Sequence, residues 1–236
     1  MIYDALAKYY DLLVKDDEAT KQWVEFTKKN ITGTKILELA CGSGEITIAL
    51  AKEGYEVCGS DLSNEMINEA KSKAGAELVN WKQLDMLDLA ALEEYDAVLC
   101  YCDSLNYIDD ETKVHSLFKK VNASLKPGGA FLFDTHSVER QKEFEEEYIE
   151  EGMLDDIGYQ WTIRHEDQIL YHNFTFYDEN GSMVQEQHCQ RIYEPELLEE
   201  LLIASGFTVK MYTDFTTEGV VEGEKIFFVA IKEESK

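Results

Sequence analysis

Residues 36–45, which read Ile-Leu-Glu-Leu-Ala-Cys-Gly-Ser-Gly-Glu, place small residues where an apolar strand turns into a helix. The small residues of this turn are Ala40, Gly42 and Gly44. Such residues let the backbone approach a ligand closely. A dinucleotide-binding turn would carry a third glycine where this chain has Thr47. Glu38, two residues before the turn, offers a carboxylate to an ammonium group. The pattern therefore favours a ligand with an amino-acid part over a pyrophosphate.

Acidic residues at the ends of the next two predicted strands are suited to bind a nucleoside. Asp61 ends the second strand, where a carboxylate accepts hydrogen bonds from both hydroxyls of an adenosine ribose. Leu62 and Met66 would cover one face of adenine, although the helical spacing of Met66 also fits core packing. Asp85, followed by Met86, offers an acceptor for an exocyclic amine at the end of the third strand. These residues predict a nucleoside bound beside an amino acid.

Polar residues also follow the fourth and fifth predicted strands. They are Cys102, Asp103, Ser104, Asn106 and Tyr107 after the fourth strand, and Asp134, Thr135, His136 and Ser137 after the fifth. Ligands collect beyond the carboxyl ends of parallel strands, so both segments are expected to face a substrate. His136 is the candidate general base, because the ordinary pKa of histidine lies near neutrality. The alternatives are a loop histidine bonded to backbone and an Asp103 that only caps a turn.

Residue types that bind metals occur here without a recognised metal-binding spacing. The five cysteines, Cys41, Cys58, Cys100, Cys102 and Cys189, are an odd number, and four lie in or beside predicted buried strands. We interpret them as reduced core thiols and expect no metal site. His165, His172 and His188 lie in extended segments, where they are expected to be partly exposed strand residues. A substrate contact or a metal site on one face is the alternative for these histidines.

Short apolar strands alternate with amphipathic helices between residues 35 and 133, as is typical of a parallel sheet covered on both faces. The predicted strands are 35–39, 56–60, 77–82, 97–101 and 130–133, and the predicted helices are 45–52, 64–73 and 111–125. Helices over 1–14 and 19–30 precede the sheet. A helix over 195–205 leads to two final strands, 207–212 and 225–232. We predict an α/β fold with a doubly wound, mostly parallel, seven-stranded sheet.

The pattern changes after Asp134 to extended segments at 159–164, 169–177 and 183–192, the last two joined by a turn at 178–181. We predict an antiparallel β insertion after strand five. The domains are then residues 1–134 with 194–236, and an inserted subdomain over 135–193. The aromatic residues of the insertion are expected to cover and select a substrate, and packing or formation of a homodimer is the alternative role. The acidic run over 143–151 is interpreted as a solvated helix face.

The composition excludes several classes of partner. The 48 acids and 22 bases give a net charge of −26, which repels phosphate backbones and disfavours nucleic acid. No apolar run approaches the roughly 18 residues of a membrane span, and the first 15 residues do not resemble a signal peptide. We therefore expect no membrane association and a cytoplasmic protein.

The motifs occur in the order Glu38 with Ala40, Gly42 and Gly44, then Asp61, then Asp85, then Pro127, Gly128 and Gly129 before the fifth strand. In this combination the sequence resembles the class I S-adenosylmethionine-dependent methyltransferases. Ala40 stands where that family usually has its first glycine. The resemblance implies a Rossmann-like fold closed by an antiparallel pair of strands, and S-adenosylmethionine as the cofactor.

The Tyr-Asp pair beginning at Tyr10 is similar to the opening of small bacterial methyltransferases that carry such a pair before the sheet. This resemblance implies that Tyr10 closes over the methionine end of the cofactor, with packing of the first helix as the alternative. Members often have a second tyrosine where this chain has Thr20. The resemblance also implies that Cys102 lies against the methionine moiety and that Asn106 and Tyr107 line the acceptor pocket.

The resulting hypothesis is methyl transfer to oxygen or nitrogen of a small molecule. Positioning and exclusion of water supply most of the catalysis of such a transfer, so a dedicated base is not required. One alternative is a non-catalytic module that only binds S-adenosylmethionine. A second is an NAD-dependent oxidoreductase, which the missing third glycine disfavours. A third is an RNA or protein methyltransferase, which the charge disfavours.

Overall fold

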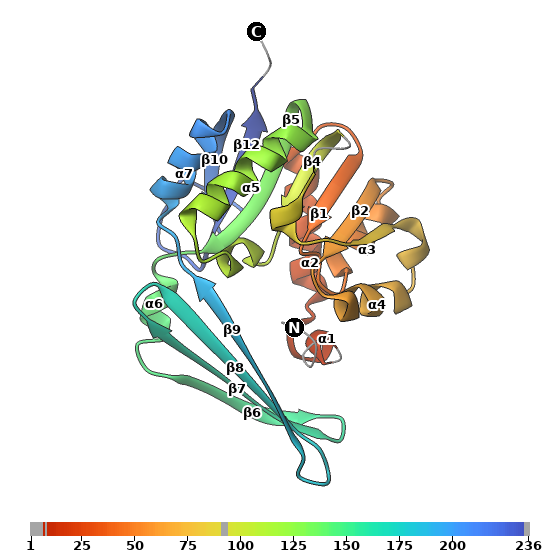
Figure 1. Cartoon of the computed structure of the whole chain (residues 1–236), viewed down its shortest axis with the longest axis vertical. Coiled ribbons are helices and arrows are strands. Elements are labelled where there is room, and N and C mark those ends of the chain that lie inside the picture. The colour runs from red at the N-terminus through yellow and green to blue at the C-terminus, as the bar shows by residue number, and fades with distance from the viewer. Residues whose placement is uncertain (1–6, 8, 91–93, 234–236) are drawn as a thin grey trace.

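The computed structural model describes residues 7, 9–90 and 94–233, which form two β-sheets (Figure 1). Within these residues the larger sheet has eight strands in the order β11-β10-β12-β5-β4-β1-β2-β3, and the smaller has four in the order β6-β7-β8-β9. The strands of the larger sheet are β1 (Lys35–Leu39), β2 (Glu56–Asp61), β3 (Asn80–Gln83), β4 (Tyr95–Cys100), β5 (Leu125–His136), β10 (Phe207–Thr213), β11 (Thr217–Glu218) and β12 (Lys225–Lys232).

Apolar runs form the centre of the larger sheet. β1 pairs in parallel with β2 and β4, and β4 pairs in parallel with β5. Ile36, Leu99 and Phe131 on these strands are fully buried, as expected for parallel strands covered on both faces. β12 runs antiparallel to β5 and to β10, which confirms the predicted doubly wound fold with an antiparallel closing pair. The additional strand β11 is two residues long, too short to produce a periodic pattern.

Helices cover both faces of this sheet. On one face α2 (Asp17–Asn30) and α3 (Glu45–Lys52) contribute Trp23, Phe26 and Leu50 to the core. On the other face α5 (Glu111–Ser124) and α7 (Pro195–Ala204) contribute Phe118 and Leu202. α4 (Asn64–Ser72) contacts β2 and β3. α3 has the predicted bounds, and the ends of α2, α4, α5 and α7 lie within two residues of the predicted ones.

The smaller sheet is an antiparallel meander of β6 (Tyr148–Leu154), β7 (Ile157–Glu166), β8 (Ile169–Tyr177) and β9 (Met183–Arg191). The prediction of a solvated helix face over 143–151 is wrong for most of its length, because only the short α6 (Arg140–Glu143) is helical and β6 follows. Pairing with β7 stabilises β6, and Glu150 accepts hydrogen bonds from the hydroxyls of Tyr148 and Tyr159 at 2.7 and 2.6 Å. Glu150 and Glu151 thus lie in a strand at the sheet edge, and Glu145, Glu146 and Glu147 lie in the irregular segment that leads into it.

Several further boundaries differ from the predicted ones. The predicted strand 77–82 begins later, because Gly75 has a φ of +99° and a short 3-10 helix, Ala76–Leu78, precedes β3. β5 begins at Leu125, so 127–129 lie inside this strand instead of before it. Of the predicted helix 1–14, α1 (Tyr10–Val14) is present, and residues 1–6 and 8 lie outside the described residues.

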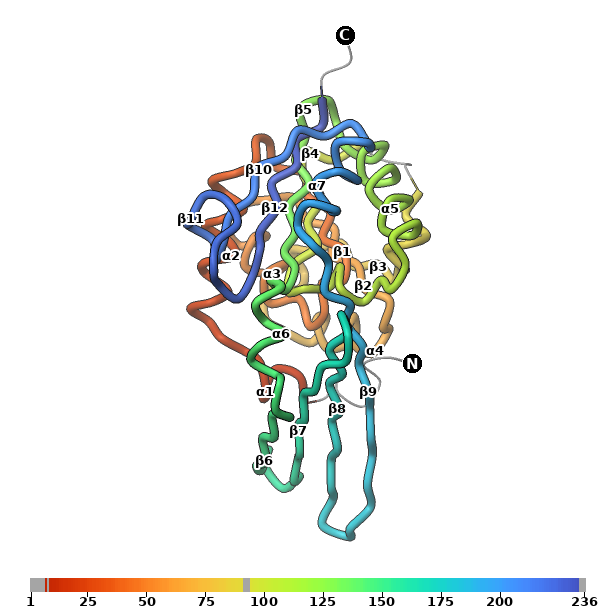
Figure 2. The backbone as a smooth tube through the Cα atoms, turned by 90° about the vertical axis from the view of Figure 1, so that its left-hand side faces the viewer, coloured from red at the N-terminus to blue at the C-terminus, as the bar shows by residue number. Residues whose placement is uncertain are grey.

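The smaller sheet is joined to the larger one by the end of β5 and by the segment that leads into α7. Figure 2 shows it extending away from the larger sheet, with α1 beside it. Tyr9, Tyr10 and Leu13 from the region of α1 pack against Phe174 and Phe176 of β8. The first helix therefore touches the inserted sheet. No helix within the described residues is long and apolar enough to cross a membrane.

Candidate functional site

A pocket lies at the carboxyl ends of β1, β2 and β4, beneath α1. It is lined by Tyr10, Glu38, Ala40, Gly42, Asp61, Leu62, Met66, Asp85, Met86 and Cys102, together with Tyr107, Asp11, Thr20, Trp23, Cys41, Ser43, Ser63, Ser104 and neighbouring side chains. Every residue expected to contact the cofactor is in this lining except Gly44. Of the three candidate catalytic residues, Tyr107 is in the lining, and Asn106 and His136 are not. The structure thus brings together predicted residues from the carboxyl ends of four strands, β1 to β4.

The turn after β1 is built from left-handed backbone. Ala40, Gly42 and Gly44 have φ values of +51°, +54° and +78°. Alanine carries a steric cost in this region that glycine does not, which explains why related turns have glycine at the position of Ala40. A Cβ atom at Gly42 would meet nothing within 4 Å, whereas one at Gly44 would lie 2.5 Å from the Trp81 ring. Gly42 therefore leaves the backbone open toward the pocket, and Gly44 is required for packing.

Glu38 is a buried carboxylate in the lining, with a relative exposure of 2%. The hydroxyl of Thr47 donates a hydrogen bond of 2.6 Å to Glu38 Oε2. The pKa of Glu38 is raised to about 7, chiefly by burial; the Thr47 hydrogen bond opposes this shift, and the nearby Asp61 adds to it. Thr47 stands where a dinucleotide-binding turn has its third glycine, and here its hydroxyl orients the Glu38 carboxylate. A cation in the pocket would favour the ionised form of Glu38.

Asp61 ends β2 and faces the same turn. Its Oδ2 accepts a hydrogen bond of 2.8 Å from the Gly42 N–H, and its Oδ1 accepts one of 2.8 Å from the Ser63 N–H. Burial raises the pKa of Asp61 above its ordinary value, and these N–H groups oppose the shift. Each carboxylate oxygen has more than one lone pair, so both can still accept a hydrogen bond from a ligand. The two backbone contacts hold the carboxylate in a fixed orientation.

The residues expected around adenine occupy the far side of the pocket. Leu62 is 46% exposed, and Met66 is 1% exposed and belongs to the core as well as to the lining. Asp85 Oδ1 accepts a hydrogen bond of 2.8 Å from the Leu87 N–H, which fixes its side chain at the start of a 3-10 helix over Met86–Asp88. An apolar surface with one oriented acceptor suits an aromatic heterocycle carrying an amine.

α1 is held over the turn by polar contacts. Ser43 donates a hydrogen bond of 2.5 Å to Asp11 Oδ1, and Lys73 forms ion pairs with Asp11 and, at 2.7 Å, with Glu45. Tyr10 starts α1 and points into the lining. Burial, followed by the electrostatic influence of Cys102 and other nearby groups, raises the pKa of Tyr10 well above its ordinary value, so its hydroxyl stays protonated. The helix forms a wall of the pocket.

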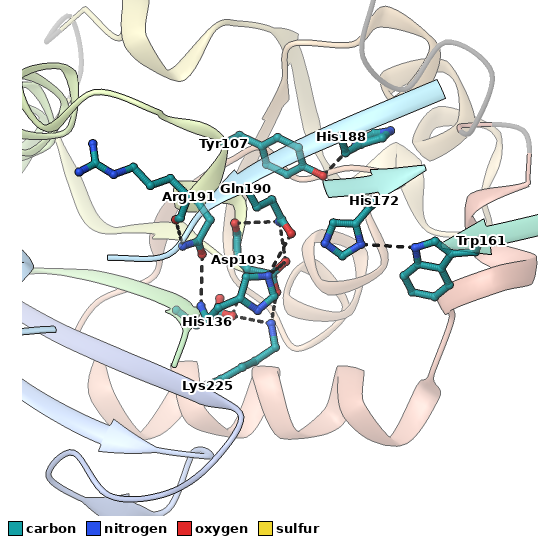
Figure 3. Close-up of polar contacts among 11 residues, drawn as sticks. Asp103, Tyr107, His136, Trp161, His172, His188, Gln190, Arg191 and Lys225 are labelled. Atoms are coloured by element: carbon teal, nitrogen blue, oxygen red, sulfur yellow. Dashed lines mark hydrogen bonds and ion pairs between the residues drawn. The ribbon is translucent and has the colours of Figure 1, made fainter. Parts of the chain in front are cut away.

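The exit from β4 adopts an unusual backbone conformation. Cys102 and Asp103 are consecutive residues with φ values of +55° and +52°, a conformation that non-glycine residues rarely adopt. This bend turns the chain into a short 3-10 helix, Ser104–Tyr107, and brings Tyr107 to the pocket. Tyr107 Oη lies 3.0 Å from His188 Nδ1 (Figure 3). His188 Nε2 lies 2.9 Å from Glu186 Oε1. β9 thus supplies two residues that sequence analysis does not connect to Tyr107.

Asn106 and His136 connect structural elements beside the pocket. Asn106 Nδ2 donates a hydrogen bond of 2.6 Å to the Arg191 carbonyl, and its Oδ1 accepts one of 3.2 Å from the His136 N–H. His136 Nε2 lies 3.0 Å from Gln190 Oε1 and 3.4 Å from Asp103 Oδ2. Burial lowers the pKa of His136, and Asp103 opposes this shift. Both side chains tie the exits of β4 and β5 to β9.

A partly buried charge cluster lies at the same exits (Figure 3). Lys225 forms ion pairs with Asp103 and, at 2.9 Å, with Asp134. Burial raises the pKa of Asp134, while Lys225 and His136 hold the pKa of Asp103 well below its usual range despite its burial. The Asp103 N–H also donates a hydrogen bond of 3.0 Å to Asp134 Oδ2. Sequence analysis does not assign Lys225, because only strand pairing places the start of β12 beside β5.

His165, His172 and His188 lie on one face of the smaller sheet, and His172 pairs directly with His188. Trp161 donates to His172 Nδ1 at 3.3 Å, and burial lowers the pKa of His172 to about 4, so this ring is neutral. Among the described residues, no group of His, Cys, Asp and Glu is arranged to hold a metal ion.

The five cysteines are free thiols. The expectation of buried core thiols is wrong for Cys102 and Cys189, which are exposed, whereas Cys58 and Cys100 are buried. Cys102 follows the end of β4 at the pocket, and Cys189 occupies an outward position of β9. The sequence showed that these cysteines lie in or beside strands, but it did not show which face of the sheet each side chain occupies.

Comparisons with known proteins agree with this geometry. A family model described as a methyltransferase domain matches residues 36–129. YqeM of Bacillus subtilis (strain 168), which is named as a methyltransferase, is 36% identical over 242 residues and covers 98% of each chain. The crystal structure of an S-adenosylmethionine-dependent methyltransferase from Clostridium acetobutylicum has a TM-score of 0.82 and 26% identity, covering 98% of this chain and 99% of that one.

A further similar structure is that of the sugar N-methyltransferase KedS8 from Streptoalloteichus, with a TM-score of 0.76, 20% identity and coverage of 99% of this chain and 94% of that one. At this identity the likeness concerns the fold. The full-length similarity to YqeM, the matched methyltransferase domain and the order of the motifs around the pocket lead to one assignment. The chain belongs to the class I S-adenosylmethionine-dependent methyltransferase family.

Proposed function

We propose that this enzyme transfers the methyl group of S-adenosylmethionine to an amine or hydroxyl of a small molecule, bound between the pocket and the inner face of the smaller sheet. The observation that carries the proposal is a pocket whose lining contains both the predicted cofactor residues and Tyr107. Cofactor and acceptor would then meet without a barrier between them. A module that only binds the cofactor would not need an acceptor side.

The pocket residues fit the cofactor. Asp61 would accept hydrogen bonds from the two ribose hydroxyls, and Asp85 with Leu62 would contact adenine. Glu38 and the N–H groups of the turn would hold the methionine end beside Tyr10. Two buried carboxylates with raised pKa values match a ligand that carries positive charge, because that charge offsets their desolvation. When bound, the cofactor supplies a sulfonium-activated methyl group.

The protein contributes mainly orientation and exclusion of water. Tyr10 and Tyr107 both line the pocket, and α1 is held over it by the contacts of Asp11. An acceptor held in line with the methyl group gains the large advantage of an intramolecular reaction. Closing the pocket with aromatic side chains removes water that would compete for polar groups. The assigned roles of Tyr10, Tyr107 and the pocket residues are part of the proposal.

The inserted sheet is proposed to cover the acceptor. Residues 135–193 would form this subdomain, and residues 1–134 with 194–236 would form the cofactor-binding domain. The inner face of the sheet carries Trp161, Phe174 and His188, and α1 packs on it. A small acceptor fits the net charge of −26, which disfavours nucleic acid. Methylation of a sugar nitrogen by KedS8 on the same fold is consistent with an amine acceptor.

A labelled-methyl screen tests the proposal. The full chain is incubated with methyl-deuterated S-adenosylmethionine and a cell extract separated into metabolites, proteins and RNA. We expect one or a few metabolites to gain the label, and fragmentation by mass spectrometry then shows whether nitrogen or oxygen carries it. Label found only in the protein or RNA fraction, or bound cofactor without any transfer, would overturn the proposal.

A further inference from the structure

β9 presents a row of polar side chains to the inside of the molecule. Glu186, His188 and Gln190 alternate with the exposed Gln185, Gln187 and Cys189 along the strand. An inward face of a strand is normally apolar, so buried polar residues at alternate positions require partners. His188 is 1% exposed and the Glu186 side chain 9% exposed. His188 and Gln190 have partners at the β4 exit, Tyr107 and Asp103, and Glu186 contacts His188.

The three side chains form a chain of hydrogen bonds from the pocket to a buried carboxylate. Tyr107 Oη lies 3.0 Å from His188 Nδ1, and His188 Nε2 lies 2.9 Å from Glu186 Oε1. With Glu186 ionised, its carboxylate only accepts hydrogen bonds, and the His188 tautomer that fits both contacts carries hydrogen on Nε2. His188 Nδ1 is then an acceptor, and the Tyr107 hydroxyl donates to it. Tyr107 thus donates to His188, and His188 donates to Glu186.

Rings hold the imidazole of His188 in this orientation. Tyr107 and Phe174 each pack against it edge to face, with ring centroids at 5.8 and 5.5 Å. The fixed ring and the carboxylate behind it reproduce the relationship between a general base and the acid that orients it. Only Tyr107 of the three lines the pocket. A proton would therefore leave the acceptor through Tyr107.

We propose that Tyr107, His188 and Glu186 form a proton relay that removes the proton displaced from the methyl acceptor; this inference rests on the proposed function. The acceptor's lone pair forms a bond to the methyl carbon, and the carbon–sulfur bond breaks with its electron pair staying on sulfur. The acceptor's proton passes to Tyr107 Oη as the Tyr107 proton passes to His188 Nδ1. The Glu186 carboxylate compensates the positive charge on the imidazole ring. The ring later returns its proton to solvent through Tyr107.

Nuclear magnetic resonance tests the relay without an acceptor. In the full chain with 15N-labelled histidine, long-range proton–nitrogen spectra report which ring nitrogen of His188 carries hydrogen. We expect hydrogen on Nε2 and an unprotonated Nδ1, and we expect Glu186→Gln to change the His188 signals. Hydrogen on Nδ1 with an unprotonated Nε2 would overturn the relay, because Tyr107 then could not pass on its proton.

Kinetics with the acceptor from the labelled-methyl screen separate a relay from a structural contact. Tyr107→Phe and His188→Asn are expected to lower kcat by roughly 100-fold or more, the usual effect of losing general-base catalysis, with little change in KM. His188→Asn keeps a polar group near the Nδ1 position without its basicity. Glu186→Gln keeps a hydrogen-bond partner without the charge and is expected to lower kcat by about tenfold.

Gln187→Ala is the matched control, because Gln187 lies between the two relay residues of β9 and points outward. Its kcat is expected to equal that of the wild type. The affinity of each variant for S-adenosylhomocysteine, measured by calorimetry, is expected to stay within about twofold of the wild type. A His188→Asn variant with normal kcat, or one whose loss is entirely in cofactor affinity, would overturn the relay. Absence of labelled product with the wild type would instead contradict the proposed function.

Discussion

Two buried carboxylates at the ends of β1 and β2 determine the electrostatic character of the pocket. Glu38 and Asp61 both have raised pKa values, chiefly because the protein removes them from water. Each is oriented by a specific donor, Thr47 for Glu38 and the Gly42 N–H for Asp61. A ligand that is positively charged or rich in hydroxyls stabilises the ionised form of such carboxylates. Their individual contributions can be measured separately.

Replacement of Asp61 is expected to weaken cofactor binding. Asp61→Ala removes two charge-assisted hydrogen bonds to the ribose, so we expect a loss of about 1 to 3 kcal/mol, roughly 5- to 150-fold in Kd for S-adenosylmethionine. Asp61→Asn keeps one acceptor oxygen and is expected to lose less. Calorimetry measures both, with Asp88→Ala as the control because Asp88 is exposed at a neighbouring loop. If Asp61→Ala bound S-adenosylmethionine as tightly as the wild type, the proposed contact between Asp61 and the ribose would be contradicted.

Cofactor binding is expected to release a proton in mildly acidic buffer. Glu38 has a raised pKa of about 7 against an ordinary value of 4.5, so between these values the free folded protein carries a proton on Glu38. The positive charge of the cofactor favours the ionised carboxylate and lowers this pKa, which releases the proton. Calorimetry at about pH 6 in two buffers of different ionisation enthalpy measures the release.

Two comparisons decide this prediction about Glu38. The number of protons released is expected to fall above pH 7, where Glu38 is already ionised, and to fall in Glu38→Gln at pH 6. The same proton release in Glu38→Gln as in the wild type would show that another group is responsible. Identical binding enthalpies in the two buffers for the wild type would show that no proton is released.

At the scale of elements, the strand exits are held together by partly buried charges. Lys225 at the start of β12 lies between Asp103 after β4 and Asp134 in β5. Asn106 and Gln190 then link these exits to β9. The backbone strain at Cys102 and Asp103 is maintained by this surrounding structure. The cluster therefore positions Tyr107 and the inserted sheet relative to the pocket.

Loss of Lys225 is expected to destabilise the fold. Lys225→Met leaves two neighbouring carboxylates without a cation, so we expect the free energy of unfolding to fall by about 3 kcal/mol. Urea denaturation monitored by fluorescence measures the change. Lys210→Met on β10 removes an exposed lysine and is expected to change stability by less than about 0.5 kcal/mol. Equal stabilities of the two variants would contradict a central role for the cluster.

The local sequence predicted the cofactor side of this site better than the acceptor side. Glu38 and Asp61 lie in strands, and Asp85 just after one, that their own neighbours specify, and all three line the pocket. The acceptor side depends on contacts between distant segments: Tyr107 and His188 are 81 residues apart in the chain. Their meeting depends on how β9 packs against the β4 exit. No local pattern encodes that packing.

The same limit explains the differences in the fold. The apolar runs of β1, β4 and β12 show their burial directly, because parallel and central strands are covered on both faces. β6, with four acidic residues within or beside its start, has no such pattern and is a strand because β7 pairs with it. The two-residue β11 likewise exists through its pairing with β10. Whether such an edge segment forms a strand depends on its pairing with a neighbouring strand and not on its composition.

At the scale of the whole molecule, the parallel sheet and α1 line the pocket, and the inserted sheet lies beside it. The parallel sheet supplies the turn and carboxylates, α1 covers them, and the inserted sheet contacts both α1 and the β4 exit. Figure 1 shows α1 between the two sheets. The net charge of −26 surrounds this arrangement with a negative potential. A small, neutral or cationic acceptor is compatible with both features.

A crystal structure of the chain with S-adenosylhomocysteine tests this account most directly. We predict the ribose hydroxyls on Asp61, the adenine beside Leu62 and Asp85, and the amino-acid end near Glu38 and Tyr10. The sulfur atom should face the side of the pocket where Tyr107 lies. A ligand bound elsewhere, or one in this pocket with its sulfur turned away from Tyr107, would contradict the account.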